Sequence, residues 1–401
     1  MRVGEYIKNN WKQCVKNNMH DDGTLIGLPY PYTVPAIGSF DELYYWDTYF
    51  TNLGLIHSDM GYMAKYNVDN MLFLVEKYGF MPNGNRTYYL NRSQPPFLSE
   101  MVKDIFEYYH DLAWLTGAFA ILKKEYEFWN TKRKSYIGLN IYSGNYDNND
   151  AQVDFESLKK RVGYVPNKTE NELGRHMLAT CESGWDCNPR WEFECYNYVS
   201  VDLNSLLYLM EKNMQYFSEE LDNGESEIWD KAAQTRQKLM MKYMKTSDDI
   251  LLDYNFVKQK TSNIFSMASF YPLYAGVATK SNAESTMRFL YKLEGEHGLY
   301  ACEKNTMPGV YQWSYPNGWA CHQYIAIVGM LKYGYTEEAK RIAYKYINII
   351  DENFKKTGIL WEKYNVNTGN TDALNEYDMP PMLGWTAGVY LAIKKLIARI
   401  K

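Results

Sequence analysis

Residues 60–79 read MGYMAKYNVDNMLFLVEKYG, and their apolar side chains recur every three or four positions. This period places those side chains on one face of an α-helix. The same spacing predicts helices over twelve ranges: 4–18, 60–79, 97–109, 111–131, 153–162, 170–181, 199–219, 226–245, 280–294, 318–333, 336–354 and 385–400. The alternation typical of β-strands is almost absent, so the chain is expected to be all-α.

The number of predicted helices suggests how they are arranged. Dividing 401 residues by twelve helices leaves about 33 residues for each helix and its loop. That number suits an (α/α)6 barrel, in which six helical hairpins close into a toroid. No internal repeat and no low-complexity linker interrupts the chain, so residues 1–401 are predicted to form a single catalytic domain.

The bulk composition excludes several functions. Lys and Arg total 43 against 48 Asp and Glu, with both signs scattered, so nucleic acid is not an expected partner. The polar N-terminus and the lack of any apolar run near ~18 residues predict no membrane contact and a cytoplasmic protein. Six scattered cysteines without a CxxC pair, and six dispersed histidines, predict no disulfide framework and no metal site. The oligomeric state stays open.

Aromatic residues are unusually abundant and point to a carbohydrate ligand. The chain has 38 Tyr, 11 Trp and 16 Phe, 16% of its residues. Most are expected in the core, but Tyr and Trp in loops also form the walls of polyhydroxy-ligand sites. Five segments combine such rings with charged or amide groups: GSFDELYYWDTYF (38–50), PNGNRTYYLNRSQPP (82–96), CESGWDCNPRW (181–191), GVYQWSYPNGW (309–319) and WEKYNVNTGNTDALNEYDMPPMLGW (361–385).

Asp186 is a candidate general acid. In ESGWD (182–186) a helix is expected to end at a glycine, and the turn would set the carboxyl of Asp186 beside the indole of Trp185. Partial desolvation against an indole raises the pKa of a carboxyl and keeps it protonated near neutrality. The alternative is that Asp186 caps the next segment or pairs with Arg190.

Glu362 is a candidate general base. It follows an aromatic residue, and Lys363 beside it either lowers its pKa or points into solvent. A carboxylate that stays ionised beside a cavity can deprotonate water. A protonated and an ionised carboxyl together fit glycoside hydrolysis, in which the acid protonates the leaving oxygen and the base activates water on the opposite face of the sugar. The alternative is an ordinary surface Glu–Lys pair.

The same segments supply groups that could hold a sugar. Hydroxyls need donors and acceptors, and sugar rings need flat faces to stack on. The polar candidates are Asp47, Asn83, Arg92, Gln94 and Glu376, and the stacking candidates are Phe40, Trp46 and Trp313.

These stretches resemble, in order and approximate spacing, the motif series of the α,α-trehalases of glycoside hydrolase family 37, from about residue 35 to 390. The segment SMASFYPLYAGVA (266–278) also resembles that family. The resemblance implies an (α/α)6 barrel and inverting hydrolysis without a cofactor, with Asp186 as acid and Glu362 as base. It also implies which residues contact the sugar: Phe40, Trp46, Asp47, Asn83, Arg92, Trp313, Glu376 and the backbone of Gly184.

Three departures from the family concern the second glucose. Ser39 stands where the family usually has an arginine, QWS (312–314) replaces its Gln-Trp-Asp, and residues 142–163 hold no clear counterpart of its Pro-Arg-Pro-Glu-Ser-Tyr segment. The leaving group is therefore open. We expect hydrolysis of α,α-trehalose to two glucose molecules. The alternatives are another α-glucosyl disaccharide or, as in sister family 63, glucosylglycerate or mannosylglycerate; a non-catalytic sugar-binding toroid is a third reading.

Overall fold

Fourteen α-helices and seven strands of two or three residues make up the regular structure of the described chain. The computed structural model describes residues 2–36, 38–145, 148–374 and 378–400, with the backbone alone for residues 148–152 and 154. The helices are α1 Val3–Asn10, α2 Tyr45–Ile56, α3 Gly61–Tyr78, α4 Leu98–Tyr109, α5 Leu112–Lys132, α6 Asn148–Val162, α7 Glu170–Glu182, α8 Val201–Glu220, α9 Ser226–Tyr243, α10 Tyr271–Ala275, α11 Lys280–Arg288, α12 Ala320–Lys332, α13 Thr336–Thr357 and α14 Gly384–Arg399. The strands are β1 Val15–Lys16, β2 Tyr32–Thr33, β3 Tyr198–Val199, β4 Tyr254–Asn255, β5 Lys260–Thr261, β6 Asn317–Trp319 and β7 Lys363–Asn365.

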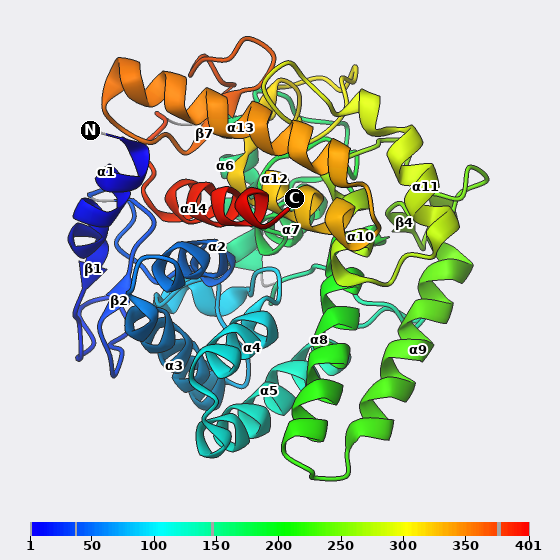
Figure 1. Ribbon diagram of the computed structural model, residues 1–401. Helices are drawn as coiled ribbons and strands as arrows, with labels where there is room; N and C mark the ends of the chain where they lie inside the picture. The colour runs from blue at the N-terminus through cyan, green and yellow to red at the C-terminus, as the bar shows by residue number, and fades with distance from the viewer. Residues whose placement is uncertain (1, 37, 146–147, 375–377, 401) are drawn as a thin grey trace.

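Six helices form a closed inner ring. Helices α2, α4, α8, α10, α12 and α14 each contact the next, and α14 returns to α2. Helices α3, α5, α9, α11 and α13 lie on the periphery, as Figure 1 shows. This arrangement is the (α/α)6 barrel that the sequence predicts, so the expected fold class is confirmed.

The ring closes tightly between α2 and α14 because glycines face each other there. A Cβ atom on Gly388 of α14 would lie 1.9 Å from the carbonyl oxygen of Phe50, and one on Gly54 would lie 2.6 Å from the Cα of Gly388. Any larger residue at these positions would push the two helices apart. Because both helices begin at the candidate site, their separation sets the width of that site.

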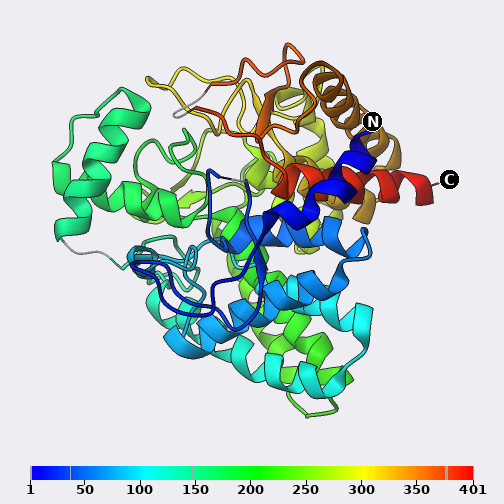
Figure 2. The ribbon, with the colours of Figure 1, turned by 90° about the vertical axis from the view of Figure 1, so that its left-hand side faces the viewer.

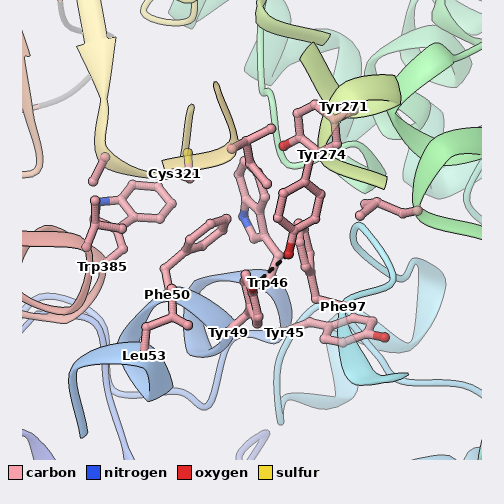
Figure 3. Close-up of a cluster of buried hydrophobic side chains, with 14 of the residues drawn as sticks. Tyr45, Trp46, Tyr49, Phe50, Leu53, Phe97, Tyr271, Tyr274, Cys321 and Trp385 are labelled. Atoms are coloured by element: carbon pink, nitrogen blue, oxygen red, sulfur yellow. Dashed lines mark hydrogen bonds between the residues drawn. The ribbon is translucent and has the colours of Figure 1, made fainter. Parts of the chain in front are cut away.

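Aromatic side chains fill the middle of the ring. Figure 3 shows Tyr49 and Phe50 of α2 against Phe97 and Tyr274, with the hydroxyls of Tyr49 and Tyr274 2.6 Å apart. The rings of Tyr49 and Phe97 stack with their centroids 4.6 Å apart. Burying such large rings makes a major contribution to stability, and this layer gives the site above it a solid floor.

The α6–α7 hairpin stands apart from the ring. It carries a separate cluster of buried apolar residues that includes Phe155, Leu158, Leu173 and Met177. Figure 2 shows the hairpin, in teal, at one end of the molecule, with the C-terminus at the other end. The hairpin is placed to cover one rim of the barrel.

Most predicted helices are found, but their ends and two further helices differ from the sequence prediction. The helix expected over 4–18 ends as α-helix at Asn10, because Val15 and Lys16 pair with β2 instead. The helix expected over 280–294 ends at Arg288, and a 3-10 turn follows. The sequence pattern does not predict α10, and it places α2 partly in a loop. Ten of the twelve α2 residues are buried, so this helix has no polar face and its sequence shows no amphipathic period.

Candidate active site

A cavity of about 170 Å³ opens at the N-terminal ends of α2 and α14. Its lining residues are Pro35, Phe40, Tyr44, Trp46, Asp47, Asn83, Tyr89, Arg92, Gln94, Gly184, Asp186, Gln312, Trp313, Trp319, Glu362, Met382 and Trp385. Every residue predicted to be in the site faces this cavity except Glu376, which lies outside the described residues. Segments far apart in the sequence therefore meet in one pocket.

Helix α7 and the turn after it present Asp186. Thr169 begins the helix with a capping box, and the helix ends at Glu182. Gly184 then turns the chain with a φ of +73°, and a Cβ at this position would lie 2.7 Å from the Trp46 ring. Only glycine suits both the positive φ and the close approach. The turn found here is the one expected from ESGWD.

Asp186 is paired with Arg161 and not with Arg190. Both terminal nitrogens of Arg161, in the last turn of α6, donate to Asp186 Oδ2 at 3.2 Å. The expected alternative, a pair between Asp186 and Arg190, is wrong. Arg190 is fully buried and forms ion pairs with Asp202 and Asp253 at 2.8 and 2.9 Å.

Arg190 supports the site from behind. Its guanidinium lies 4.3 Å from the ring centres of both Trp185 and Trp191. A buried guanidinium between two indoles gains cation–π attraction as well as its ion pairs. The charge therefore fixes Trp185, the immediate neighbour of Asp186, instead of serving as a ligand group.

Glu182 connects three segments behind the cavity. Its buried carboxylate accepts from Arg133 Nε at 2.8 Å and from the backbone N–H groups of Ser93, Ser143 and Gly144 at 2.9, 2.7 and 3.0 Å. Burial opposes its ionisation, but Arg133 and these N–H groups outweigh burial and lower the pKa of Glu182. One carboxylate thus ties the polar loop that carries Gln94 to the end of α7.

Glu362 is presented by a short antiparallel pair of strands. Strand β7 pairs with β6, with Trp319 opposite Lys363. Glu362 is 3% exposed, and Lys363 Nζ lies 2.7 Å from its Oε2 while fully buried itself. The surface-pair alternative is therefore wrong: this is a buried charge pair beside the cavity. The Lys363 ammonium also lies 4.7 Å from the ring centre of Trp319.

Indole rings form the apolar walls. Trp313 stacks on Trp319 with the ring centroids 3.7 Å apart and the planes 5° apart. Trp46 and Trp385 lie against Trp313, at 5.6 and 6.1 Å between centroids. Trp385 also donates its Nε1–H to the carbonyl oxygen of Glu362 at 3.1 Å. These walls offer flat faces to a sugar ring.

The loop before α4 supplies the polar wall. Arg92 Nε donates to Asn83 Oδ1 at 3.0 Å, and its guanidinium lies 5.0 Å from the Tyr89 ring centre. Gln94 Oε1 is 3.4 Å from the backbone nitrogen of Trp46, a long hydrogen bond. Pro95 and Pro96 then end the loop, as the sequence predicts, and α4 begins at Leu98. Planar donors and acceptors are thereby held in fixed directions around the cavity.

Asp47 interacts electrostatically with both candidate catalytic carboxyls, Asp186 and Glu362. Burial, reinforced by the nearby Glu362 and Asp186 carboxyls, raises the pKa of Asp47 from 3.8 to about 7. Asp47 is therefore poised to donate or accept a hydrogen bond near neutral pH. Three carboxyls beside indole walls are a suitable setting for acid–base chemistry on a neutral polyhydroxy ligand.

Several contributors were missed by sequence reasoning. Tyr44, Tyr89, Trp319 and Trp385 belong to the quoted segments, but nothing in their pattern distinguishes them from core aromatics. Arg161 stands in the basic run KKR (159–161), which looks like a solvated helix face. Ser39, which stands where the family usually has an arginine, is exposed and does not line the cavity.

Comparison with known proteins gives a consistent family. The Trehalase family model matches residues 1–398. A periplasmic trehalase of Escherichia coli O1:K1 / APEC is 32% identical over 98% of this chain and 74% of its own length. A periplasmic trehalase of Xanthomonas axonopodis pv. citri (strain 306) is 31% identical over 98% of this chain and 73% of its own length.

Solved structures agree with the fold. The neutral trehalase Nth1 from Saccharomyces cerevisiae superposes with a TM-score of 0.79 at 31% identity, over 98% of this chain and 79% of that one. A GH63 mannosylglycerate hydrolase from Thermus thermophilus in complex with glucose superposes with a TM-score of 0.66 at 16% identity, over 90% of this chain and 95% of that one. At this identity the similarity supports the fold alone. With the family model matching nearly the whole chain and relatives above 30% identity, the chain belongs to the trehalase family.

Proposed function

We propose that the chain is an inverting glycoside hydrolase of family 37 that cleaves α,α-trehalose into two glucose molecules. The observation that carries this proposal is that Asp186 and Glu362 line one cavity together with indole walls and amide groups. The relatives named trehalases at 31–32% identity support the choice of substrate. Residues 1–401 are proposed to act as one catalytic domain.

In this mechanism Asp186 protonates the glycosidic oxygen and Glu362 activates water on the opposite face of the sugar. Arg161 contacts only Oδ2 of Asp186 and holds the carboxyl in a fixed direction before the sugar arrives, so Oδ1 is the oxygen that would carry the transferred proton. Lys363 compensates the buried charge of Glu362. Phe40, Trp46 and Trp313 would stack on the glucose that is cleaved, and its hydroxyls would bond to polar groups that line the cavity: Asp47, Asn83, Arg92 and Gln94. Gly184 would contact it through its backbone, and Glu376 is proposed from the sequence alone.

The roles are tested by isosteric substitutions. Asp186→Asn and Glu362→Gln keep the shape of each side chain but remove the acid or the base, so each should lower kcat at least ~100-fold. NMR of the first products should show one β-glucose and one α-glucose from trehalose, as inversion at a single carbon requires. Wild-type rates in either folded variant, or two α-anomers at first, would refute the mechanism.

A second candidate keeps the mechanism and changes the leaving group. It is favoured by Ser39, which stands where the family usually has a sugar-contacting arginine and is exposed. A panel of trehalose, other α-glucosyl disaccharides, glucosylglycerate and mannosylglycerate separates the two, and a clear preference for trehalose removes this candidate.

The compartment is also a proposal. None of the helices in the described ranges has the length and apolar character needed to cross a bilayer. The bacterial relatives are named periplasmic. We propose the cytoplasm from the six cysteines, all of them described and buried, none joined in a disulfide.

A further inference from the structure

A second cavity, of about 420 Å³, lies at the other end of the barrel. It is formed by the last residues of α2 and α14, by α4 and by Tyr324 of α12. Helix α2 links the two cavities: Asp47 faces the first, and Ile56 faces the second. At 1.5 Å per residue these positions are about 14 Å apart along the helix. The aromatic layer of Figure 3 lies between them, with Leu53 of α2 on the side of the second cavity.

One wall of the second cavity is cationic. Lys395 and Arg399 lie one turn apart on α14, and Lys395 Nζ donates to His57 Nδ1 at 3.2 Å. Burial, together with the charges of Lys395 and Arg399, lowers the pKa of His57 to about 4. His57 is therefore neutral near pH 7 and adds no charge. Among the described residues, neither Lys395 nor Arg399 has a carboxylate within ion-pair distance.

The opposite wall holds a carboxyl oxygen without a hydrogen-bond partner. Asp104 Oδ2 is buried, and no group in the described part of the chain bonds to it. Burial, with the negative charges of Glu100 and Glu107 adding to it, raises the pKa of Asp104 well above its ordinary value. The shift favours the protonated form of Asp104, which can donate its O–H. Glu107, on the rim, has Lys103 at 4.0 Å.

The charges do not balance inside the cavity. The exposed cations Lys395 and Arg399 face Glu107, whose own partner is Lys103, and Asp104, whose protonated form is favoured by burial. A basic residue in the last turn of a helix interacts well with the helix dipole, which accounts for Arg399 at the end of α14 but not for Lys395. The dipole also does not account for the buried Asp104 oxygen across the cavity, because buried polar atoms normally have hydrogen-bond partners.

We propose that this cavity binds a small phosphorylated sugar or polyol. The phosphate would contact Lys395 and Arg399, since charge-assisted bonds to phosphate are what these side chains form best. A hydroxyl of the ligand would accept from the protonated Asp104, and the apolar floor of Leu53, Ile56 and Leu396 would cover the carbon skeleton. A free inorganic ion would satisfy the cations but leave Asp104 and the floor unoccupied.

Calorimetric titration with glucose 6-phosphate, inorganic phosphate and glucose tests this proposal. Glucose 6-phosphate should bind most tightly. The double variant Lys395→Ala/Arg399→Ala removes both phosphate contacts and should weaken its binding at least ~10-fold, since the loss of even one charge-assisted bond would do so. Lys394→Ala is the matched control, because Lys394 is the adjacent residue on α14 but contacts Tyr390 and does not line the cavity.

The design also separates this site from the active site. Binding of glucose 6-phosphate in the active-site cavity would be unchanged by the double variant, and that result would overturn the proposal. Equal affinity for inorganic phosphate would overturn the sugar part of it, and no binding of either phosphate to wild type would overturn it entirely. Hydrolysis by the double variant without added phosphate should match wild type, which shows that the variant is folded.

Discussion

Replacing Asp47 by asparagine should stabilise the sugar-free protein, and the gain should grow with pH. Raising the pKa of Asp47 from 3.8 to about 7 makes its ionisation in the folded state about 4 kcal/mol less favourable than in the unfolded chain. The unfolded chain loses this proton near pH 4 and the folded protein near pH 7. The destabilisation is therefore absent below about pH 4, grows between pH 4 and 7, and is constant above that. Asparagine stays neutral at every pH.

The difference between the two proteins can be measured by urea unfolding at pH 5 and pH 8. The two pKa values give at most about 2.6 kcal/mol of extra stabilisation for Asp47→Asn at pH 8 relative to pH 5. Water in the cavity and movement of side chains reduce this, so we expect at least ~1 kcal/mol. Groups such as Glu125, whose pKa burial raises to about 7, are common to both proteins and cancel.

Two results would refute the reasoning about Asp47. The first is the same stability difference at pH 5 and pH 8, and the second is a smaller difference at pH 8. A further measurement at pH 9 is the internal control, because Asp47 is already ionised in both states and the difference should no longer change. Hydrolysis should fall in the same variant, since an amide is a poorer acceptor for a sugar hydroxyl than a carboxylate.

Two further substitutions test residues around Asp186. His322 is fully buried with its ring 4.0 Å from that of Trp185, and neither of its ring nitrogens has a hydrogen-bond partner among the described residues. His322→Phe removes these unsatisfied nitrogens and should raise the free energy of unfolding by ~1–2 kcal/mol in urea melts. A loss of stability would contradict this expectation. Arg161→Ala should lower kcat/KM ~10–100-fold, because it releases the Asp186 carboxyl. Arg161→Lys should recover part of the activity. Lys159→Ala is the control and should not change kcat/KM, because the partner of Lys159 is the surface Glu156. Wild-type kinetics in Arg161→Ala would show that the pair has no positioning role.

The sequence allows the helices to be predicted wherever one face is polar. Helices α3 and α13 show the apolar period clearly, and their predicted ends lie within three residues of the observed ones. Helix α2 does not, because it is buried on nearly all sides and its residues match a core strand or an aromatic loop equally well. The part of the fold that carries the site is thus the part that periodicity describes least.

The candidate site was predictable where chemistry is concentrated in short segments. Asp186 and Glu362 stand beside aromatic residues and turns, which marks them in the sequence. Arg161 could not be found in this way, because its role comes from the packing of the α6–α7 hairpin and not from its neighbours in the chain. The second cavity was equally hidden, since Asp104 and Lys395 belong to ordinary amphipathic helices and meet only when the ring closes.

Five charged residues of the aromatic segments illustrate two different physical tasks. Arg92, Asp186 and Glu362 face the cavity, whereas Glu182 and Arg190 are buried behind it. A buried ion pair adds little net stability, but removing one partner leaves an uncompensated charge and typically costs ~3–5 kcal/mol. Such pairs act as strict positional constraints on the segments they join. Without the pairs behind it, a cavity built from loops would lose the fixed directions that two carboxyls need in order to act on one bond.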